Sequence, residues 1–333
     1  MNRRDFILTA MAASLPTPLF AESVGVTGAG ATFPNPIYQK WGEAAKAAGV
    51  ATLNYQSVGS GAGVTQIKNR TVDFGASDAP VKPDDLAKAS LFQFPTVIGA
   101  VVPVVNVPGV QKDQLTLTGE LIADMYAGRI TKWNDPKVAA LNPSLNLPSI
   151  AIAPVYRADG SGTTFVWTSY LSARSGAWSS SVGASTSVKW PAGTGSRGNE
   201  GVAASVAALK GSIGYVEYAF VKQGKLAAVN LVSKSGEFVT ASMAQFSKAA
   251  AAADWSGAGY VPSLIDSSVG WPITAPTYVL VPTDTDRSKA AVKFFDWCYD
   301  HGDALATELE YVPLPKSVKD SIRAKWRELK LVG

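Results

Sequence analysis

The sequence predicts an α/β fold with mostly parallel sheets, and three observations lead to that prediction. Segments with the composition of strands alternate with segments whose apolar residues recur at helical spacing. Turns of small residues join several of these pairs, at 27–33, 59–63 and 157–164. Two β-like runs, at 96–105 and 278–281, enclose a further set of strands and helices. Alternation of this kind is typical of βαβ units, in which neighbouring strands run in the same direction.

The first expected elements are a strand and a long helix. Val24–Thr27 has a β-like composition, and the helix after it begins at Pro34, a residue that the first helical turn tolerates. Thr32 is well placed as the N-cap of this helix. The helix is expected over 34–48 because its apolar residues recur at helical spacing, at Ile37, Tyr38, Trp41 and Ala45.

The following segments repeat the order of strand, turn and helix. A strand at 53–55 precedes the second small-residue turn, which opens a helix that holds Val64 and Ile67. Residues 72–78 have the composition of a buried strand that ends at the polar Asp78. Later in the chain the same patterns predict strands at 152–156 and 213–216, and a helix with one face formed by Val292, Phe295, Cys298, Tyr299 and Gly302.

The order of the segments indicates that one domain is inserted into another. A complete α/β region lies between the two long β-like runs, which we expect to be extended crossings, and the chain after 282 returns to helix. Ligands bound between two such lobes are held by hinge closure. The predicted parts are an outer lobe of residues 22–98 plus 277–333 and an inserted lobe of residues 99–276.

The composition fits a globular protein of two domains. The 333 residues are 47% hydrophobic and 17% charged, which is enough apolar material for a sizeable core. The net charge of +4 is small, and no Lys/Arg run lies between aromatic residues, so nucleic acid is not an expected partner. Cys298 and His301 are single, which excludes an internal disulfide and a multi-histidine metal site. We expect no cofactor and no metal.

Residues 1–21 have the pattern of an export signal. Arg3 and Arg4 precede an apolar stretch that is too short to span a bilayer, and Ala21 is a small residue at a plausible cleavage point. Paired arginines followed by Phe6 fit the twin-arginine route, with the general secretory route as the alternative. Because no cysteine lies near residue 21 to carry a lipid, we expect an exported, soluble protein without a membrane anchor.

The three small-residue turns share a chemistry that suits a small oxyanion. Glycine lets the backbone approach a ligand, and the start of a helix leaves N–H groups without partners. Those donors and the helix dipole both favour an anion. Arg157 adjoins the third turn with a planar guanidinium that matches a tetrahedral oxyanion. The alternatives are that Arg157 forms a salt bridge with Asp159 and that Ser60 is only a turn residue.

Longer motifs carry a family resemblance, which spans about residues 26–328. The motifs include GAGATFPNPIYQKW (28–41), NYQSVGSGAGVTQIKNRTVDFGASDAP (54–80), FQFPTVIGAVVPVVNVPG (92–109), ITKWNDPKVAALNP (130–143) and RADGSGTTFVWTSYL (157–171). The chain is similar in these segments to the periplasmic phosphate-binding proteins of phosphate ABC importers, the PstS type. That resemblance implies a two-lobed periplasmic-binding-protein fold of type II. Each lobe would be a mostly parallel sheet flanked by helices, with phosphate in the cleft between the lobes.

The resemblance also implies which residues contact phosphate. Carried over position by position, the contacts fall on Thr32, Phe33, Ser60, Asp78, Arg157, Ser161, Gly162 and Thr163. The second small-residue turn departs from the family pattern, because Gly61 stands where the family has a second serine, and this puts a secondary contact in doubt. Ser161 and Thr163 are also suited to cap and begin a helix, a role compatible with ligand binding.

Asp78 is the unusual member of this set, because a carboxylate repels an anion. Its structural interpretation is a turn residue or an N-cap at the end of a strand. Its functional interpretation is that it accepts a hydrogen bond from a ligand that still carries a proton, since an ionised aspartate can only accept. Phosphate near neutral pH keeps at least one proton, whereas sulfate keeps none.

These expectations combine into a binding protein with no catalytic step. It would capture inorganic phosphate in the periplasm, act as a monomer and deliver the ion to the membrane permease subunits of a phosphate ABC importer. The alternatives are a secreted phosphatase with Ser60 or Ser161 as nucleophile, a binder of sulfate or molybdate, and an adhesin or phosphate sensor. Residues 193–198 match G-x-G-x-x-G without a strand before them, so we expect a solvated loop there that contains Arg197.

Replacement of both Arg3 and Arg4 by lysine tests the export route. If the twin-arginine pathway exports the chain, the double variant should leave uncleaved precursor in the cytoplasm. Immunoblots of cytoplasmic and periplasmic fractions measure this. Normal periplasmic levels of the double variant would indicate the general secretory route instead.

Overall fold

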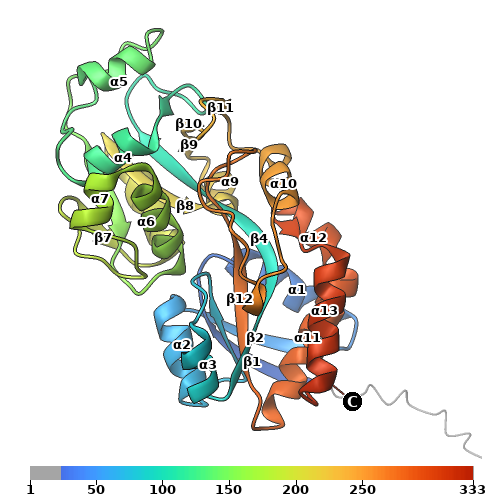
Figure 1. Cartoon of the computed structure of the whole chain (residues 1–333). Helices are drawn as coiled ribbons and strands as arrows, with labels where there is room; N and C mark the ends of the chain where they lie inside the picture. The colour runs from blue at the N-terminus through green and yellow to red at the C-terminus, as the bar shows by residue number, and fades with distance from the viewer. Residues whose placement is uncertain (1–23, 333) are drawn as a thin grey trace, which may run out of the picture.

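A computed structural model describes residues 24–332, which form two lobes joined by long strands (Figure 1). One lobe carries helices from both ends of the chain, in blue and red, and the other carries helices from its middle, in green. The predicted α/β fold with two lobes is confirmed. The predicted export signal at 1–21 lies outside the described residues. Within residues 24–332, no helix has both the length and the apolar character to cross a membrane.

The main sheet follows the order β2-β1-β3-β12-β4-β8-β6-β7. Its strands are β1 (Val24–Gly30), β2 (Ala51–Ser57), β3 (Phe74–Ser77), β4 (Leu91–Asn106), β6 (Ala153–Arg157), β7 (Thr194–Ser196), β8 (Ser212–Glu217) and β12 (Thr274–Pro282). Two short strands that pair with β4 are β9 (Ala227–Ala228) and β13 (Val312–Pro313). A smaller sheet contains β5 (Thr116–Leu117), β10 (Asn230–Val232) and β11 (Phe238–Val239).

Each lobe contains a set of parallel strands, as the alternating pattern predicts, although the short strands β9, β11 and β13 pair antiparallel with their neighbours. In one lobe β1 pairs in parallel with β2 and β3, and in the other β6 pairs in parallel with β7 and β8. The two long strands differ, because β12 runs antiparallel to both β3 and β4, and β4 runs antiparallel to β8. The carboxyl ends of parallel strands are where α/β folds bind ligands.

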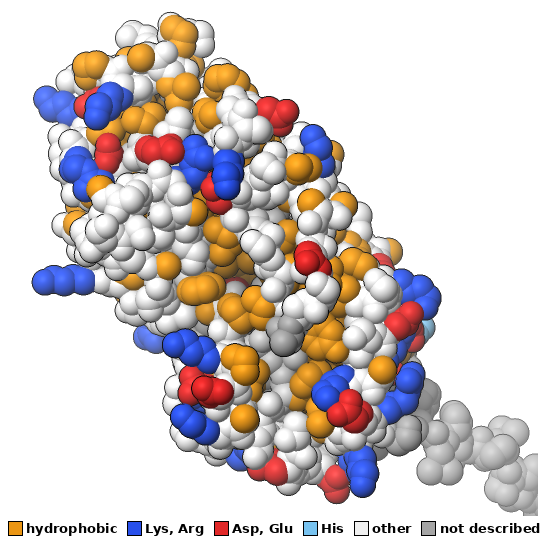
Figure 2. Space-filling view, viewed as in Figure 1, with side chains coloured by type: hydrophobic (Ala, Val, Ile, Leu, Met, Phe, Trp, Pro, Cys, Tyr) orange, Lys and Arg blue, Asp and Glu red, His pale blue; other side chains and the backbone are white. Residues whose placement is uncertain are grey.

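Strand β4 belongs to both lobes. Its residues 91–100 pair with β12, and its residues 101–106 pair with β8. Almost all of its side chains are buried, which explains the near-continuous apolar run in the sequence. The predicted lobe boundaries at 98/99 and 276/277 fall inside β4 and β12, and they stay a prediction. On the face shown in Figure 2, hydrophobic side chains gather between the two lobes, while charged side chains of both signs are interspersed elsewhere.

The helices of the first lobe cover both faces of its sheet (Figure 1). They are α1 (Asn35–Ala47), α2 (Ser60–Lys68), α3 (Pro83–Lys88), α11 (Arg287–His301), α12 (Asp303–Glu308) and α13 (Lys316–Glu328). The predicted apolar face of α1 is confirmed, because Ile37, Tyr38, Trp41 and Ala45 are all buried. The prediction that Thr32 caps α1 is wrong. The cap position is Pro34, and the Thr32 hydroxyl instead accepts hydrogen bonds from Asn199.

The remaining helices come from the middle of the chain. They are α4 (Gly119–Tyr126), α5 (Pro136–Leu141), α6 (Gly162–Arg174), α7 (Gly176–Ser181), α8 (Gly198–Ala208), α9 (Tyr218–Gly224), α10 (Met243–Ala251) and the short 3₁₀ helix η1 (Ala258–Tyr260). Aromatic rings fill the core between α6 and β8, where Trp167 stacks on Tyr215 with ring centroids 4.9 Å apart. The Tyr215 hydroxyl also links the start of α6 to the end of β6, because it accepts from the N–H of Arg157 at 3.1 Å and lies 2.7 Å from the hydroxyl of Thr164.

A glycine in α2 tests how tightly this helix must approach the sheet. A Cβ atom on Gly63 would lie 2.5 Å from the Cα of Gly30, and 2.7 and 2.8 Å from the carbonyl oxygens of Ala29 and Ala76. Because all these atoms belong to the backbone, Gly63→Ala should lower the free energy of unfolding by about 1–3 kcal/mol. Denaturant unfolding measures the change. Gly25→Ala is the control, since nothing lies within 4 Å of its Cβ position; equal effects of the two variants would contradict the close approach.

Candidate functional site

The predicted site residues lie at strand ends and helix starts that face each other between the lobes. From the first lobe come Thr32 and Phe33 after β1, Ser60 at the start of α2, and Asp78 after β3. From the second lobe come Arg157 at the end of β6, Ser161 before α6, and Gly162 and Thr163 in its first turn. All eight are buried. The structure therefore brings together residues that the chain separates widely.

The second and third small-residue turns, one from each lobe, touch through backbone atoms and the hydroxyl of Ser60. The N–H of Gly61 donates to the carbonyl oxygen of Gly160 at 2.9 Å. The hydroxyl of Ser60 accepts from the N–H of Gly162 at 3.0 Å and from the N–H of Asp78 at 3.3 Å. A Cβ atom at position 61 would lie 3.3 Å from the Cα of Gly160. The absence of a second serine at position 61 therefore lets the two turns meet closely.

The start of α6 is held by a cap and by glycine. Ser161 is the N-cap, and its hydroxyl accepts from the N–H of Thr164 at 3.0 Å, which confirms the capping prediction. A Cβ atom on Gly162 would lie 2.6 Å from the Cβ and Oδ2 atoms of Asp78, so only glycine fits there. The N–H groups of Thr163 and Phe33 donate to no other residue within 24–332. The backbone donors of Phe33 and Thr163 therefore remain available at the site.

Arg157 forms the salt bridge with Asp159 that the sequence suggested as an alternative to a binding role. Its Nε lies 2.8 Å from Oδ1 of Asp159, and the pair is almost fully buried, with side-chain exposures of 1% and 9%. The same guanidinium reaches the site, because its Nη1 lies 3.4 Å from the hydroxyl of Thr163. Burial raises the pKa of Asp159, but the hydrogen bonds and charge of Arg157 outweigh it and hold that pKa below its usual value. The two interpretations of Arg157 are therefore compatible.

Asp78 is buried with an incompletely compensated charge. Its Oδ1 accepts a hydrogen bond from the Thr277 hydroxyl at 2.8 Å. Burial raises the pKa of Asp78 to about 7, although the Thr277 hydrogen bond, the charge of Arg157 and the Ser60 hydroxyl act in the opposite direction. Near neutral pH the Asp78 carboxyl is therefore balanced between its neutral and charged forms.

Asn199 is a site residue that sequence reasoning missed. It lies in the first turn of α8 with no exposed surface, and its side-chain amide donates to the hydroxyl of Thr32 at 2.6 Å and to that of Thr163 at 3.2 Å. The sequence feature that could have indicated Asn199 is its position as a polar residue directly after Gly198, at the start of a helix. Thr277 was missed too, although a polar residue beside the apolar run of β12 marks it.

A second buried network supports the Thr32–Phe33 loop. The Tyr311 hydroxyl lies 2.6 Å from the carbonyl oxygen of Phe33 and 2.9 Å from Oε2 of Glu217. Burial raises the pKa of Glu217 well above its usual value, against hydrogen bonds from the Ala219 N–H and from Tyr311. Glu217 also caps α9, so this contact joins the two lobes behind the site.

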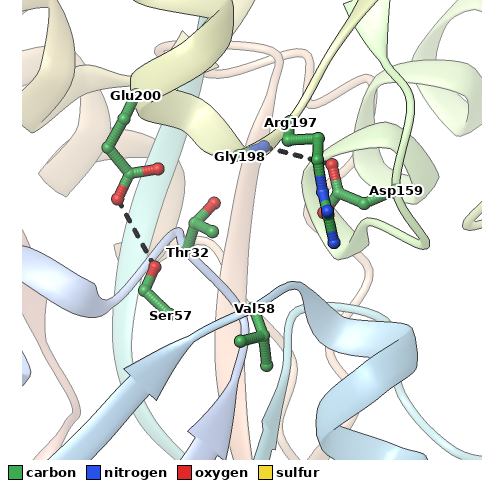
Figure 3. Close-up of a pocket in the computed structure, with 7 residues that line it drawn as sticks. All are labelled: Thr32, Ser57, Val58, Asp159, Arg197, Gly198 and Glu200. Carbon is green, nitrogen blue, oxygen red and sulfur yellow. Dashed lines mark hydrogen bonds between the residues drawn. The ribbon is translucent and has the colours of Figure 1, made fainter.

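A cavity of about 260 Å³ opens beside the cluster (Figure 3). It is lined by Thr32, Ser57, Val58, Asp159, Arg197, Gly198 and Glu200. The Ser57 hydroxyl donates to Oε1 of Glu200 at 3.4 Å, which links β2 to α8 across the cavity (Figure 3). Arg197 is exposed and lines this cavity. The expected loop at 193–198 is wrong in part, because residues 194–196 form β7, which pairs with β6.

Groups that would support hydrolysis are not assembled around the serines. Within residues 24–332, no group of three or more His, Cys, Asp and Glu side chains is placed to hold a metal ion. His301 stacks on Trp297, and its Nδ1 lies 3.0 Å from the carbonyl oxygen of that residue. The Ser60 and Ser161 hydroxyls accept from backbone N–H groups instead of facing an imidazole.

The raised pKa of Asp78 can be tested by comparing how the free energy of unfolding depends on pH in the parent and in Asp78→Asn. The folded protein holds the proton of Asp78 more tightly than the unfolded chain, whose aspartate pKa is about 3.9. Below about pH 3.9, the protonated Asp78 makes its full contribution to the free energy of unfolding. That contribution decreases as the pH rises and is lost once the pH passes the folded pKa of about 7. Between about pH 4 and pH 7, the free energy of unfolding of the parent should therefore fall by up to about 4 kcal/mol relative to that of Asp78→Asn.

Denaturant unfolding of both proteins at a series of pH values measures this difference, in which other titrating groups cancel. A difference that stays constant between pH 4 and 7 would contradict the raised pKa of Asp78.

Comparison with known proteins places the chain in a family. A family profile described as "PBP superfamily domain" matches residues 16–301. The "Phosphate-binding protein PstS" of Pasteurella multocida (strain Pm70) is 47% identical, and the alignment covers 98% of this chain and 96% of that protein. The protein of the same name from Methanocaldococcus jannaschii is 32% identical over 87% of this chain and 82% of its own length.

Solved structures share the fold at lower identity. A periplasmic phosphate-binding protein, PfluDING, solved with bound phosphate, aligns with a TM-score of 0.73 and 22% identity, covering 90% of this chain and 93% of that one. A phosphate-binding protein from Stenotrophomonas maltophilia aligns with a TM-score of 0.66 and 20% identity, covering 91% and 94%. The sequence motifs, the two-lobed fold and the near-complete alignments agree, and the chain belongs to the PstS family of phosphate-binding proteins within the PBP superfamily.

Proposed function

We propose that this chain captures inorganic phosphate in the periplasm and delivers it to the membrane subunits of a phosphate ABC importer, without a catalytic step. The observation that carries the proposal is a buried cluster of hydrogen-bond donors from both lobes, with one carboxyl acceptor, in a member of the PstS family. The ligand contacts are Thr32, Phe33, Ser60, Asp78, Arg157, Ser161, Gly162 and Thr163.

The donors of the cluster match the acceptors of a tetrahedral oxyanion. The N–H groups of Phe33 and Thr163 have no partner within residues 24–332 and lie at the starts of α1 and α6, where anions are favoured. Arg157 adds a charged donor that is fixed by Asp159. Because that ion pair is neutral as a whole, binding depends on aligned donors more than on net positive charge.

Asp78 supplies the selectivity. In its charged form, which prevails above its pKa of about 7, this carboxylate can accept the hydrogen of an anion that still carries one. Sulfate and molybdate are fully deprotonated near neutral pH, so each would face the carboxylate without a hydrogen to donate. Sites that pair with a ligand hydroxyl reject analogues that lack it by about 10⁴-fold or more. The site should therefore prefer phosphate.

Closure of two lobes completes the mechanism that we propose. The outer lobe consists of residues 22–98 plus 277–333, and the inserted lobe of residues 99–276. Strand β4 supports this division, because it exchanges β12 for β8 as its partner after residue 100. A ligand that contacts both lobes favours the closed form, and the importer recognises that form.

Calorimetric titration with phosphate and sulfate, of the parent and of Arg157→Ala, tests the proposal. The parent should bind phosphate and exclude sulfate. A hydrogen bond to a charged group contributes roughly 1.5–3 kcal/mol, so Arg157→Ala should weaken phosphate binding by about tenfold to several hundredfold. Arg157→Lys should restore only part of the loss, since lysine lacks the planar fork.

Two controls separate loss of a ligand contact from other effects. Arg129→Ala removes an arginine whose partner is Asp124 at the surface, and it should leave phosphate binding unchanged. The double variant Arg157→Ala/Asp159→Ala removes the carboxylate that the single variant leaves unpaired. Unchanged affinity in a folded Arg157→Ala would exclude Arg157 from the site, and a parent that binds neither ion would contradict the function.

A further inference from the structure

The side chain of Asn199 has every hydrogen-bonding group engaged. Its Nδ2 carries two hydrogens, one for the Thr32 hydroxyl at 2.6 Å and one for the Thr163 hydroxyl at 3.2 Å. Its Oδ1 accepts from the backbone N–H of Glu217 at 2.9 Å, and its own backbone N–H donates to the Thr32 hydroxyl at 3.1 Å. Such complete engagement, without exposed surface, fixes the amide in one place.

The direction of these hydrogen bonds is set by a group that can only donate. A backbone N–H has no lone pair to offer, so the atom of Asn199 that faces Glu217 N must be the oxygen Oδ1. The amide nitrogen must then face the two threonines. Glu217 is itself anchored, because its carboxylate accepts from the N–H of Ala219 at 2.8 Å at the start of α9.

This polarity decides what the threonine hydroxyls can do. A hydroxyl has one hydrogen and two lone pairs. The Thr32 oxygen accepts twice from Asn199, and the Thr163 oxygen accepts from Asn199 and from Arg157 at 3.4 Å. Within residues 24–332, neither hydroxyl donates to an acceptor. Both hydrogens are therefore left for another acceptor.

We infer that Asn199 is a positioning residue that makes Thr32 and Thr163 obligate donors to the bound anion. The inference rests on the proposed function, since the anion is the missing acceptor. Asn199 need not touch the ligand. It occupies the lone pairs of both hydroxyls, and each hydroxyl hydrogen then points away from it.

Lobe closure creates this arrangement at Thr32. Thr32 belongs to the loop after β1, whereas Asn199 and Thr163 lie on α8 and α6 of the other lobe. Figure 3 shows Thr32 facing the N-terminal turn of α8, beside Gly198. In an open form the Thr32 hydroxyl would rotate freely and would either accept or donate. When the lobes close, Asn199 occupies the lone pairs of the Thr32 hydroxyl, and the hydroxyl can then only donate its hydrogen to the bound anion.

A double-mutant cycle tests the role of Asn199, read by calorimetric titration with inorganic phosphate. The four proteins are the parent, Asn199→Ala, Thr32→Val/Thr163→Val, and the triple variant. In the parent background, Asn199→Ala should weaken phosphate binding by about tenfold or more. In the Thr32→Val/Thr163→Val background, Asn199→Ala should weaken phosphate binding by less than about twofold, because no hydroxyl remains to be oriented. A purely structural role of Asn199 would give equal losses in both backgrounds.

Two further variants keep the test decisive. Asn199→Asp preserves the size of the side chain and the acceptor for Glu217 N, but replaces both N–H donors by a group that can only accept. It would draw the threonine hydrogens away from the anion, so it should weaken phosphate binding more in the threonine background than in the valine background. Thr32→Ser/Thr163→Ser retains the hydroxyls and should retain the dependence on Asn199. Thermal unfolding confirms that each variant is folded.

The outcomes separate this inference from the proposed function. If the parent fails to bind phosphate, the proposed function is contradicted and the inference fails with it. If the parent binds phosphate and removal of Asn199 costs nothing, or costs equally with and without the threonine hydroxyls, the inference alone is overturned. A loss confined to the hydroxyl-containing background supports it.

Discussion

Removal of ionisable groups from water is the constraint on which this site depends. Asp78, Arg157 and Asp159 are buried where the lobes meet, and each buried charge is costly unless it is paired or neutralised. The arginine and Asp159 satisfy one another, which leaves Asp78 with a pKa of about 7. The site therefore has little net positive charge, and the direction of its hydrogen bonds must distinguish one anion from another.

The fold supplies those directions through backbone geometry. Parallel strands end at the junction of the lobes, and helices that begin there present unpaired N–H groups. Glycine makes the approach possible, because Gly61 lies against Gly160 and any side chain at Gly162 would collide with Asp78. Small residues in these turns thus allow the lobes to meet closely.

Contacts between the lobes are made by the same atoms that would hold the ligand. The Ser60 hydroxyl accepts from Gly162 of the opposite lobe, and the Thr32 hydroxyl accepts from Asn199. In the function that we propose, closure and ligand recognition are therefore one event, in which each lobe orients the donors of the other. Strand β4 connects this event to the rest of the molecule, since it pairs with strands of both lobes along its length.

The sequence by itself indicated the alternation of strand, turn and helix around the small-residue turns, the buried face of α1 and the cap at Ser161, because these follow from periodicity and from neighbours a few residues apart. It misplaced Thr32 as a helix cap and did not indicate Asn199 or Thr277. These roles depend on hydrogen bonds between residues 167 and 199 positions apart in the chain, which leave no local pattern. Only the tertiary structure, by burying these polar groups together, decided which partner each of them has and which hydrogens remain for a ligand.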